Sequence, residues 1–290
     1  MNTLRYLNDP LMAGMVWPVV VTGLAVATLC ALLSVLVVLK RLAFIGQGIS
    51  HAGFGGMGMA AVLGLVGAGA TQTAGTAMAQ FLVVLTVCLL SALLIGFMSE
   101  RTGAEADTAI GIVLVGTMAA GVVLVRQAKT AVSVESFLFG DILAVSWADA
   151  AIGWGVALGV LLTLWAVRRP LLIWSFDPVV ARAVGVNERR MNLLLMVLLG
   201  LATVTAMKLA GVVLATAMLV LPCSIALRLS RRWARVLALA ALAAVIGVAG
   251  GLGVSFELDW PPGAAVVSVL CGLFALAWLA GSARRTPAPA

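Results

Sequence analysis

Residues 15–41 read MVWPVVVTGLAVATLCALLSVLVVLKR, a long and predominantly apolar run that ends at two adjacent cations. An α-helix needs about 20 mostly apolar residues to cross the roughly 30 Å hydrocarbon layer of a membrane. The run is too long for the apolar core of a signal peptide, and no small-residue cleavage site follows it. We therefore interpret residues 15–39 as a retained membrane-spanning helix.

The composition of the whole chain agrees with this interpretation. Of the 290 residues, 63% are apolar and 10% are charged, whereas soluble proteins have roughly 45–50% apolar and about 25% charged residues. This excludes a soluble enzyme, a nucleic-acid-binding domain and a disordered chain. The four cysteines lie in apolar runs without a C-x-x-C pair, which predicts packed free thiols rather than a metal cluster or a disulfide.

The remaining apolar segments predict an all-α, polytopic transmembrane helix bundle with eight or nine spans, forming a single domain over residues 1–290. The division between the sixth and seventh spans rests on Lys208, because a charge at mid-span costs about 2.5–3.5 kcal/mol on insertion scales. The nine candidate spans are 15–39, 43–68, 78–98, 108–125, 147–167, 191–207, 209–229, 234–254 and 263–281.

The distribution of Lys and Arg predicts the orientation of the spans. If the first span ends on the cytoplasmic side, 14 of the 18 Lys and Arg residues fall on that side and four fall outside. Cytoplasmic loops of membrane proteins carry such an excess of cations. The sequence therefore predicts an outside N-terminus and an inside C-terminus.

The longest cytoplasmic insert, residues 168–190, contains a signal for the start of a helix. Asp177 precedes Pro178, and an acid at the N-cap followed by proline at the first helical position is typical of a helix N-terminus. We expect a short helix over residues 179–183 that stops at Gly185. Such a helix is either a docking element or a capped connector at the membrane interface, and the residues alone leave both readings open.

The second span contains a regular series of small residues. Small residues four apart let helix backbones approach closely in membranes, so this span is expected to be central and tightly packed. Every fourth position from residue 48 is small, and the series is Gly48, Ala52, Gly56, Ala60, Gly64 and Ala68.

His51, the only histidine of the chain, lies in the same span. It follows Arg41 by ten residues, about 15 Å at the helical rise, which predicts a position near the membrane midplane. An ionisable group at that depth marks a pathway for ions or substrate. Gln47 lies one turn away and Ser50 is adjacent, so an imidazole, an amide and a hydroxyl are expected to cluster there.

Imidazole is a good ligand for transition metals, and a symmetric dimer would bring two copies of His51 to one axis. The alternative is a neutral histidine that is hydrogen-bonded to a neighbouring helix.

The order of the motifs along the chain resembles that of the permease family of ABC transporters that import zinc, manganese or iron. The resemblance covers about residues 14–280 and depends on the whole set rather than on one motif. The matching motifs are KRLAFIG (40–46), SHA (50–52), ADTAIGI (106–112), SFLFG (136–140), SFDP (175–178), ARAVG (181–185), LAGVVL (209–214), LP (221–222) and DWPPG (259–263).

The resemblance implies an ABC importer permease in the bacterial cell membrane. Its expected partners are a cytoplasmic ATPase that binds ATP, an extracytoplasmic metal-binding protein, and a second permease copy or a paralogue. No permanently bound cofactor is implied. His51 matches a position that contacts the passing divalent metal ion, with Gln47 and Ser50 beside it. Residues 170–190 match the segment that couples to the ATPase, through Ser175, Phe176, Asp177, Pro178, Ala181, Arg182 and Gly185.

One residue departs from the family pattern, because Gln47 stands where the family usually has an aspartate. A neutral amide is a poorer ligand than a carboxylate for a divalent cation, so the identity of the metal is left open.

The alternative function is a proton-coupled secondary transporter or channel that uses His51 and needs no ATPase. An embedded metalloenzyme is disfavoured by the single histidine and the missing H-E-x-x-H motif.

Overall fold

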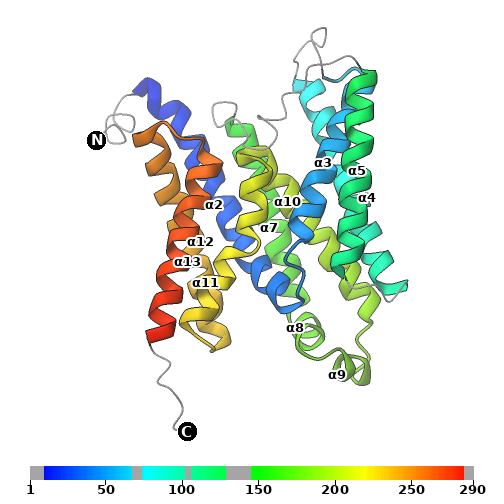
Figure 1. Cartoon of the computed structure of the whole chain (residues 1–290), viewed down its shortest axis with the longest axis vertical. Helices are drawn as coiled ribbons and strands as arrows, with labels where there is room; N and C mark the ends of the chain where they lie inside the picture. The colour runs from blue at the N-terminus through cyan, green and yellow to red at the C-terminus, as the bar shows by residue number, and fades with distance from the viewer. Residues whose placement is uncertain (1–9, 67–73, 102–105, 129–144, 284–290) are drawn as a thin grey trace.

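The computed structural model describes residues 10–66, 74–101, 106–128 and 145–283. All regular structure in these residues is helical, in agreement with the predicted all-α bundle (Figure 1). The helices are α2 (Pro10–Leu39), α3 (Ile45–Val62), α4 (Ala74–Arg101), α5 (Ala106–Gln127), α7 (Trp147–Ala166), α8 (Arg168–Phe176), α9 (Pro178–Ala183), α10 (Glu188–Met218), α11 (Leu221–Leu229), α12 (Trp233–Leu258) and α13 (Pro262–Ala283).

Eight helical segments among the described residues are long and apolar enough to cross a membrane, and they agree with eight of the nine predicted spans. The remaining predicted span, 43–68, corresponds to α3. Helix α2 starts at one end of the bundle and α13 finishes at the other (Figure 1), as an odd number of crossings requires. The eight segments are Val16–Leu39, Gly75–Glu100, Ala106–Gln127, Trp147–Ala166, Glu188–Met207, Gly211–Leu229, Trp233–Leu258 and Pro262–Ala280.

Helix α3 is shorter than the predicted span 43–68. It has 18 residues, which makes it about 27 Å long at the helical rise. Its glycines, together with Gln47 and His51, make it less apolar than its neighbours. It packs between α4, α5 and α10, so protein rather than lipid surrounds most of it.

The chain reverses between the sixth and seventh spans, as predicted: Lys208 lies between Met207, where one span ends, and Gly211, where the next begins. Gly211 has a φ of 78°, a left-handed conformation that glycine adopts without steric cost. The two apolar spans lie on either side, at Glu188–Met207 and Gly211–Leu229. These two spans, called the two arms below, both contribute to α10, and the second arm continues into α11.

Contacts with α3 give the direction of the two arms. Met207 lies against Gly53, whereas Thr216 lies against Gly46, seven residues earlier in α3. The second arm therefore runs back toward the start of α3.

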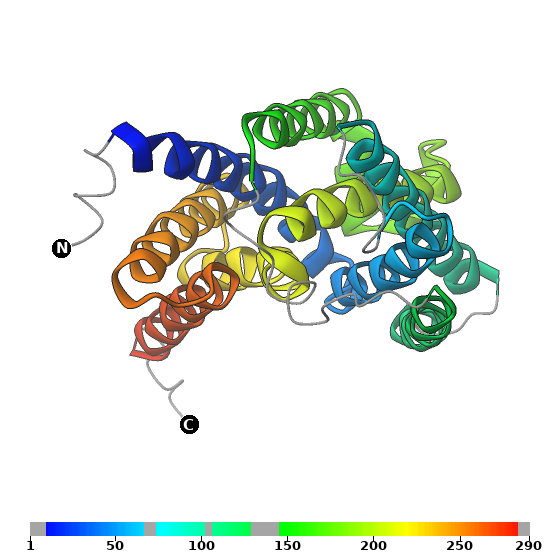
Figure 2. The same ribbon diagram turned by 90° about the horizontal axis from the view of Figure 1, so that it is seen from above.

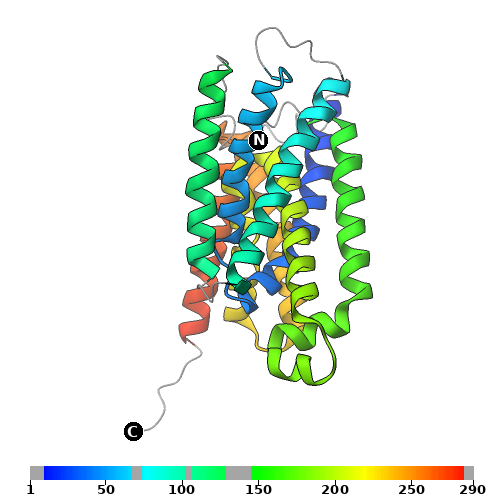
Figure 3. The ribbon, with the colours of Figure 1, turned by 90° about the vertical axis from the view of Figure 1, so that its right-hand side faces the viewer.

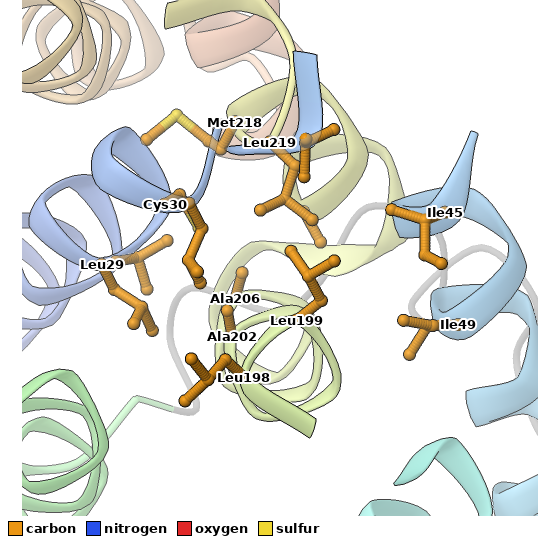
Figure 4. Packing of buried hydrophobic residues seen from close by; sticks show 14 of the residues in the cluster. Leu29, Cys30, Ile45, Ile49, Leu198, Leu199, Ala202, Ala206, Met218 and Leu219 are labelled. Atoms are coloured by element: carbon orange, nitrogen blue, oxygen red, sulfur yellow. The ribbon is translucent and has the colours of Figure 1, made fainter. Parts of the chain in front are cut away.

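Helix α10 lies at the centre of the bundle. Seen from above, it separates α2, α11, α12 and α13 from α3, α4 and α5 (Figure 2), and it contacts members of both groups. Figure 4 shows the core where α2, α3 and both arms meet, including Leu29, Ile49, Leu199 and Leu219. The position of α3 thus depends on α10 as well as on its direct neighbours in the chain.

The cysteine prediction is confirmed for three of the four residues. Cys30, Cys88 and Cys223 are buried free thiols, whereas Cys271 is free but exposed on α13. Helix α13 lies at the edge of the bundle (Figure 2), so an apolar run in the sequence did not ensure burial within one protomer.

Candidate functional site

Helix α3 carries the candidate site, and its backbone lies unusually close to that of α5. A Cβ on Gly58 would lie 2.8 Å from the carbonyl oxygen of Gly121 in α5. A Cβ on Gly121 would in turn lie 2.9 Å from the backbone nitrogen of Gly55. Because both partners of this contact are backbone atoms, a larger side chain at either position would force the helices apart.

The predicted series of small residues lies mostly in these helix interfaces. Gly48, Ala52, Gly56 and Ala60 are buried, and a Cβ on Gly56 would lie 2.8 Å from the Cα atom of Val84 in α4. Gly64 does not belong to this set, because α3 ends at Val62 and Gly64 is exposed beyond it. Ala68 lies outside the described residues.

Gln47 and His51 lie on the remaining face of α3, the one that its neighbours leave uncovered. The Gln47 side chain is exposed and His51 is half-buried. Two turns beyond His51 the same face presents Met59, which is 40% exposed. The two polar side chains are therefore accessible from outside the protomer, at the helical spacing i, i+4 that places them together.

The hydrogen bond of His51 determines which ring nitrogen is available. Its Nδ1 atom lies 3.0 Å from the backbone carbonyl oxygen of Gln47. A carbonyl can only accept, so Nδ1 must carry the proton, and the lone pair of the neutral ring is then on Nε2. A histidine whose other nitrogen donates to a backbone carbonyl is the usual arrangement of a metal-ligating imidazole.

Ser50 does not join this pair. Its side chain is buried, and its hydroxyl donates a hydrogen bond of 3.2 Å to the carbonyl oxygen of Gln47. Adjacent residues of an α-helix point in directions about 100° apart, so Ser50 faces the bundle while His51 faces outward. The predicted cluster of three polar side chains is thus reduced to an amide and an imidazole.

The predicted depth of His51 also needs correction. Residues 41–44 form a turn, with Arg41 at a φ of 56°, and they add no helical rise. His51 is therefore six residues from the start of α3, about 9 Å along a helix of about 27 Å. It lies about a third of the way along α3, on the side of the midpoint that faces α8 and α9.

The insert 168–190 folds into two short helices at that end of the bundle (Figure 3). The predicted start of the second helix is confirmed: Asp177 Oδ1 accepts hydrogen bonds from the backbone nitrogens of Val179 and Val180, at 2.8 and 3.1 Å. Helix α9 ends at Ala183, followed by Gly185 with a φ of 81°. The sequence did not predict α8.

Helix α8 is anchored to the ends of two spans. The ammonium of Lys40, just after α2, donates a hydrogen bond of 2.8 Å to the carbonyl oxygen of Trp174 and lies 3.4 Å from the centre of its ring. Partial burial lowers the pKa of Lys40, and the charge of Glu188 opposes this shift. Phe176 packs edge-on against Trp233 at the start of α12, with ring centres 5.3 Å apart.

The candidate coupling residues divide into an inner and an outer group. Ser175 and Ala181 are buried, and the Ser175 hydroxyl bonds to the carbonyl oxygen of Leu171. Arg182 pairs with Glu188 at 3.4 Å on the outer side. The outer group is Phe176, Asp177, Pro178, Arg182 and Gly185.

Sequence reasoning missed three apolar residues on the outer side of the same segment. Val179, Val180 and Val184 are 68%, 49% and 61% exposed. Three valines exposed around one capped turn outside the spans are suited to contact another protein. In the sequence these valines are visible as apolar residues within the predicted short helix 179–183 and directly after it.

Comparisons with known proteins agree with this architecture. The family model described as "ABC 3 transport family" matches residues 12–281. The chain is 34% identical over 280 residues to the manganese transport system membrane protein MntC of Halalkalibacterium halodurans, covering 96% of this chain and 91% of the relative. It is 31% identical to the manganese import system permease protein ScaB of Streptococcus parasanguinis, covering 91% and 90%.

A solved structure has the same fold. The chain aligns with PsaBC from Streptococcus pneumoniae, determined in complex with Fab, with a TM-score of 0.79, 27% identity and 95% coverage of both chains. The family model and this agreement extend over nearly the whole chain, including α3 and the α8–α9 segment. The chain therefore belongs to the ABC 3 transport family, as a multi-pass permease subunit of a bacterial cell membrane that leaves ATP hydrolysis to a separate subunit.

Proposed function

We propose that this permease imports a divalent transition-metal ion, with manganese as the first candidate. The observation that carries the proposal is that half-buried His51, whose Nδ1 is engaged by the Gln47 carbonyl, leaves Nε2 available beside the exposed Gln47 side chain on α3. Two relatives that match most of the chain are named as manganese transport proteins. Zinc and iron remain within the proposed substrate class, because imidazole also binds these metals.

The proposed pathway requires a second permease chain. His51 is the only histidine of this chain, so a site with two imidazoles needs another copy of α3 across the uncovered face. We infer a homodimer in which each protomer contributes His51 and Gln47. A paralogue in place of the second copy would contribute its own residues at the same positions.

The proposal also assigns roles to two partner proteins. An extracytoplasmic metal-binding protein delivers the ion, and a cytoplasmic ATPase binds ATP and contacts the segment 170–190. The exposed valines of α9 supply an apolar contact, while the buried Ser175 and Ala181 hold the segment against the bundle. The aromatic contact of Phe176 with Trp233 would transmit movement of α9 to α12.

The direct test is ATP hydrolysis by the complete complex in proteoliposomes. With the metal-binding protein present, we expect stimulation by Mn²⁺ and accumulation of the metal inside right-side-out vesicles. Ca²⁺ and Mg²⁺ serve as controls, since these ions prefer all-oxygen sites. The proposal fails if no transition-metal ion stimulates hydrolysis. Proton-coupled transport through His51 would instead continue without ATP and stop when an uncoupler removes the proton gradient.

The Asp177 cap provides a test of the coupling segment. Replacing an N-cap aspartate by alanine costs about 1 kcal/mol, so Asp177→Ala should increase opening of α9 about fivefold. Amide hydrogen exchange of residues 179–183 measures this opening, and metal-stimulated ATP hydrolysis should decrease in parallel. Asp177→Asn is the matched control, because asparagine caps helices equally well. Unchanged stimulation in Asp177→Ala, despite faster exchange, would contradict a coupling role for α9.

A further inference from the structure

An apolar groove of about 730 Å³ lies on another side of the bundle, between α2, α7, α8 and α12. Leu32 and Leu36 of α2 and Leu158 and Leu162 of α7 form its walls. Leu171 of α8 lines its end, next to the buried Trp174. Its volume falls in the range of about 300–1,000 Å³ that is usual for ligand sites.

The groove has one charged lining residue, Arg168, at the junction of α7 and α8. The Arg168 guanidinium lies 5.2 Å from the ring centre of Trp165, another lining residue. Trp233 lines the groove from the start of α12, where Arg232 and Arg235 flank it in the chain. Tryptophans and cations together are typical of the boundary between hydrocarbon and headgroups.

The dimensions of the groove match one leaflet of a membrane. From Leu158 to the last residue of α7, Ala166, the helical rise adds up to about 12 Å. Half of the hydrocarbon layer is about 15 Å thick. The apolar walls therefore extend from near the midplane to the interface, where Arg168 begins α8.

We propose that this groove binds an anionic phospholipid of the cytoplasmic leaflet. An acyl chain lies along Leu36, Leu158 and Leu162, and the headgroup phosphate contacts Arg168. Basic pockets between transmembrane helices on the cytoplasmic side recognise anionic headgroups in this way. The cytoplasmic assignment follows from the excess of Lys and Arg at this end of the chain's spans.

Lipid binding in this groove is independent of the transported substrate. Its occupant is a lipid rather than a protein helix because the lining is apolar apart from Arg168, which lies beside Trp165 as at a headgroup boundary. Because Leu171 lines the groove and belongs to the same helix as Phe176, a bound lipid would also support α8 from the membrane side.

The test counts retained lipids by native mass spectrometry on the complex of the permease with its ATPase, purified from bilayers of phosphatidylglycerol and phosphatidylethanolamine. We expect wild type to retain phosphatidylglycerol preferentially. Arg168→Gln should reduce this preference about fivefold, the effect of one interfacial cation, whereas Arg168→Lys should keep it. Leu162→Trp, which fills the groove, should reduce retention of both lipids.

Two control variants separate the groove from general surface effects. Arg126→Gln removes a cation at the end of α5, and Leu90→Trp enlarges an exposed residue of α4 outside the groove. Both should behave as wild type. The proposal is overturned if Arg168→Gln retains phosphatidylglycerol like wild type, if the two lipids are retained equally, or if a protein chain cross-links to the groove in place of lipid.

Discussion

His51→Ala is expected to lower the apparent affinity of the reconstituted transporter for Mn²⁺ by at least about tenfold. Loss of even an indirect partner of a metal ligand costs about 10–100-fold in affinity, and His51 is proposed as a direct ligand. In a homodimer one substitution removes both imidazoles. The measurement is the Mn²⁺ concentration that half-maximally stimulates ATP hydrolysis, together with uptake of the metal into proteoliposomes.

Gln47→Asp should change the same quantity in the opposite direction. A carboxylate in place of the amide adds a negative charge one helical turn from the imidazole, where it attracts a dication. We expect tighter half-saturation for Mn²⁺ and a slower maximal rate, because an ion that binds more tightly leaves more slowly. Gln127→Asp, an exposed position at the end of α5, adds the same charge away from α3 and is the matched control.

A specific result would remove His51 from the pathway. If His51→Ala retained wild-type half-saturation and uptake, the hydrogen bond to Gln47 would be a structural feature of α3 only. A loss of activity accompanied by a lower melting temperature would indicate that the substitution destabilises the folded protein rather than a metal site. Thr86→Ala, which removes a polar side chain from an exposed face of α4, controls for loss of polarity within a span.

The second large effect is expected for Gly121→Leu in α5. A Cβ there would lie 2.8 Å from Cδ1 of Phe54 and 2.9 and 3.0 Å from the backbone nitrogen and Cα atom of Gly55, and the backbone cannot move aside. Overpacking of this kind costs about 3 kcal/mol, or roughly 6–12 °C in melting temperature for a chain of this size. Displacement of α3 would also move His51, so transport should be lost even in molecules that remain folded.

Gly116→Leu is the matched control on the same helix, because a Cβ at Gly116 has nothing within 4 Å. Its melting temperature in detergent should lie within a few degrees of wild type. Equal melting temperatures for the two variants would mean that α3 and α5 separate easily, and that the close approach of their backbones contributes little to stability.

Much of the architecture follows from local sequence. The apolar spans depend on lengths of about 20 residues that hydrocarbon requires, and eight of them were found where the pattern predicts them. The start of α9 depends on two neighbouring residues, Asp177 and Pro178, and its cap hydrogen bonds are those expected. In both cases the determining interaction is within the segment or with the solvent around it.

The geometry of the candidate site could not be predicted from local sequence. Ser50 is close to His51 in the chain but faces the bundle, because the neighbours of α3 determine which side is covered. The depth of His51 changed because Arg41 adopts a left-handed conformation that interrupts the helical rise. Helix α8 is held in place because Trp174 contacts Lys40 and Phe176 contacts Trp233. The residues of each pair are more than 50 positions apart in the chain.

The sequence by itself determined the solvent of this protein, its set of spans and the end of the bundle that carries its cations. These properties depend on transfer energies that accumulate residue by residue along one segment. Only the tertiary structure decided that Gly121 lies against Gly55 and Gly58. It also decided that His51 and Gln47 share the uncovered face of α3, and that Arg168 lines an apolar groove. Each of these depends on which helices become neighbours, and that choice is a property of the whole packed bundle.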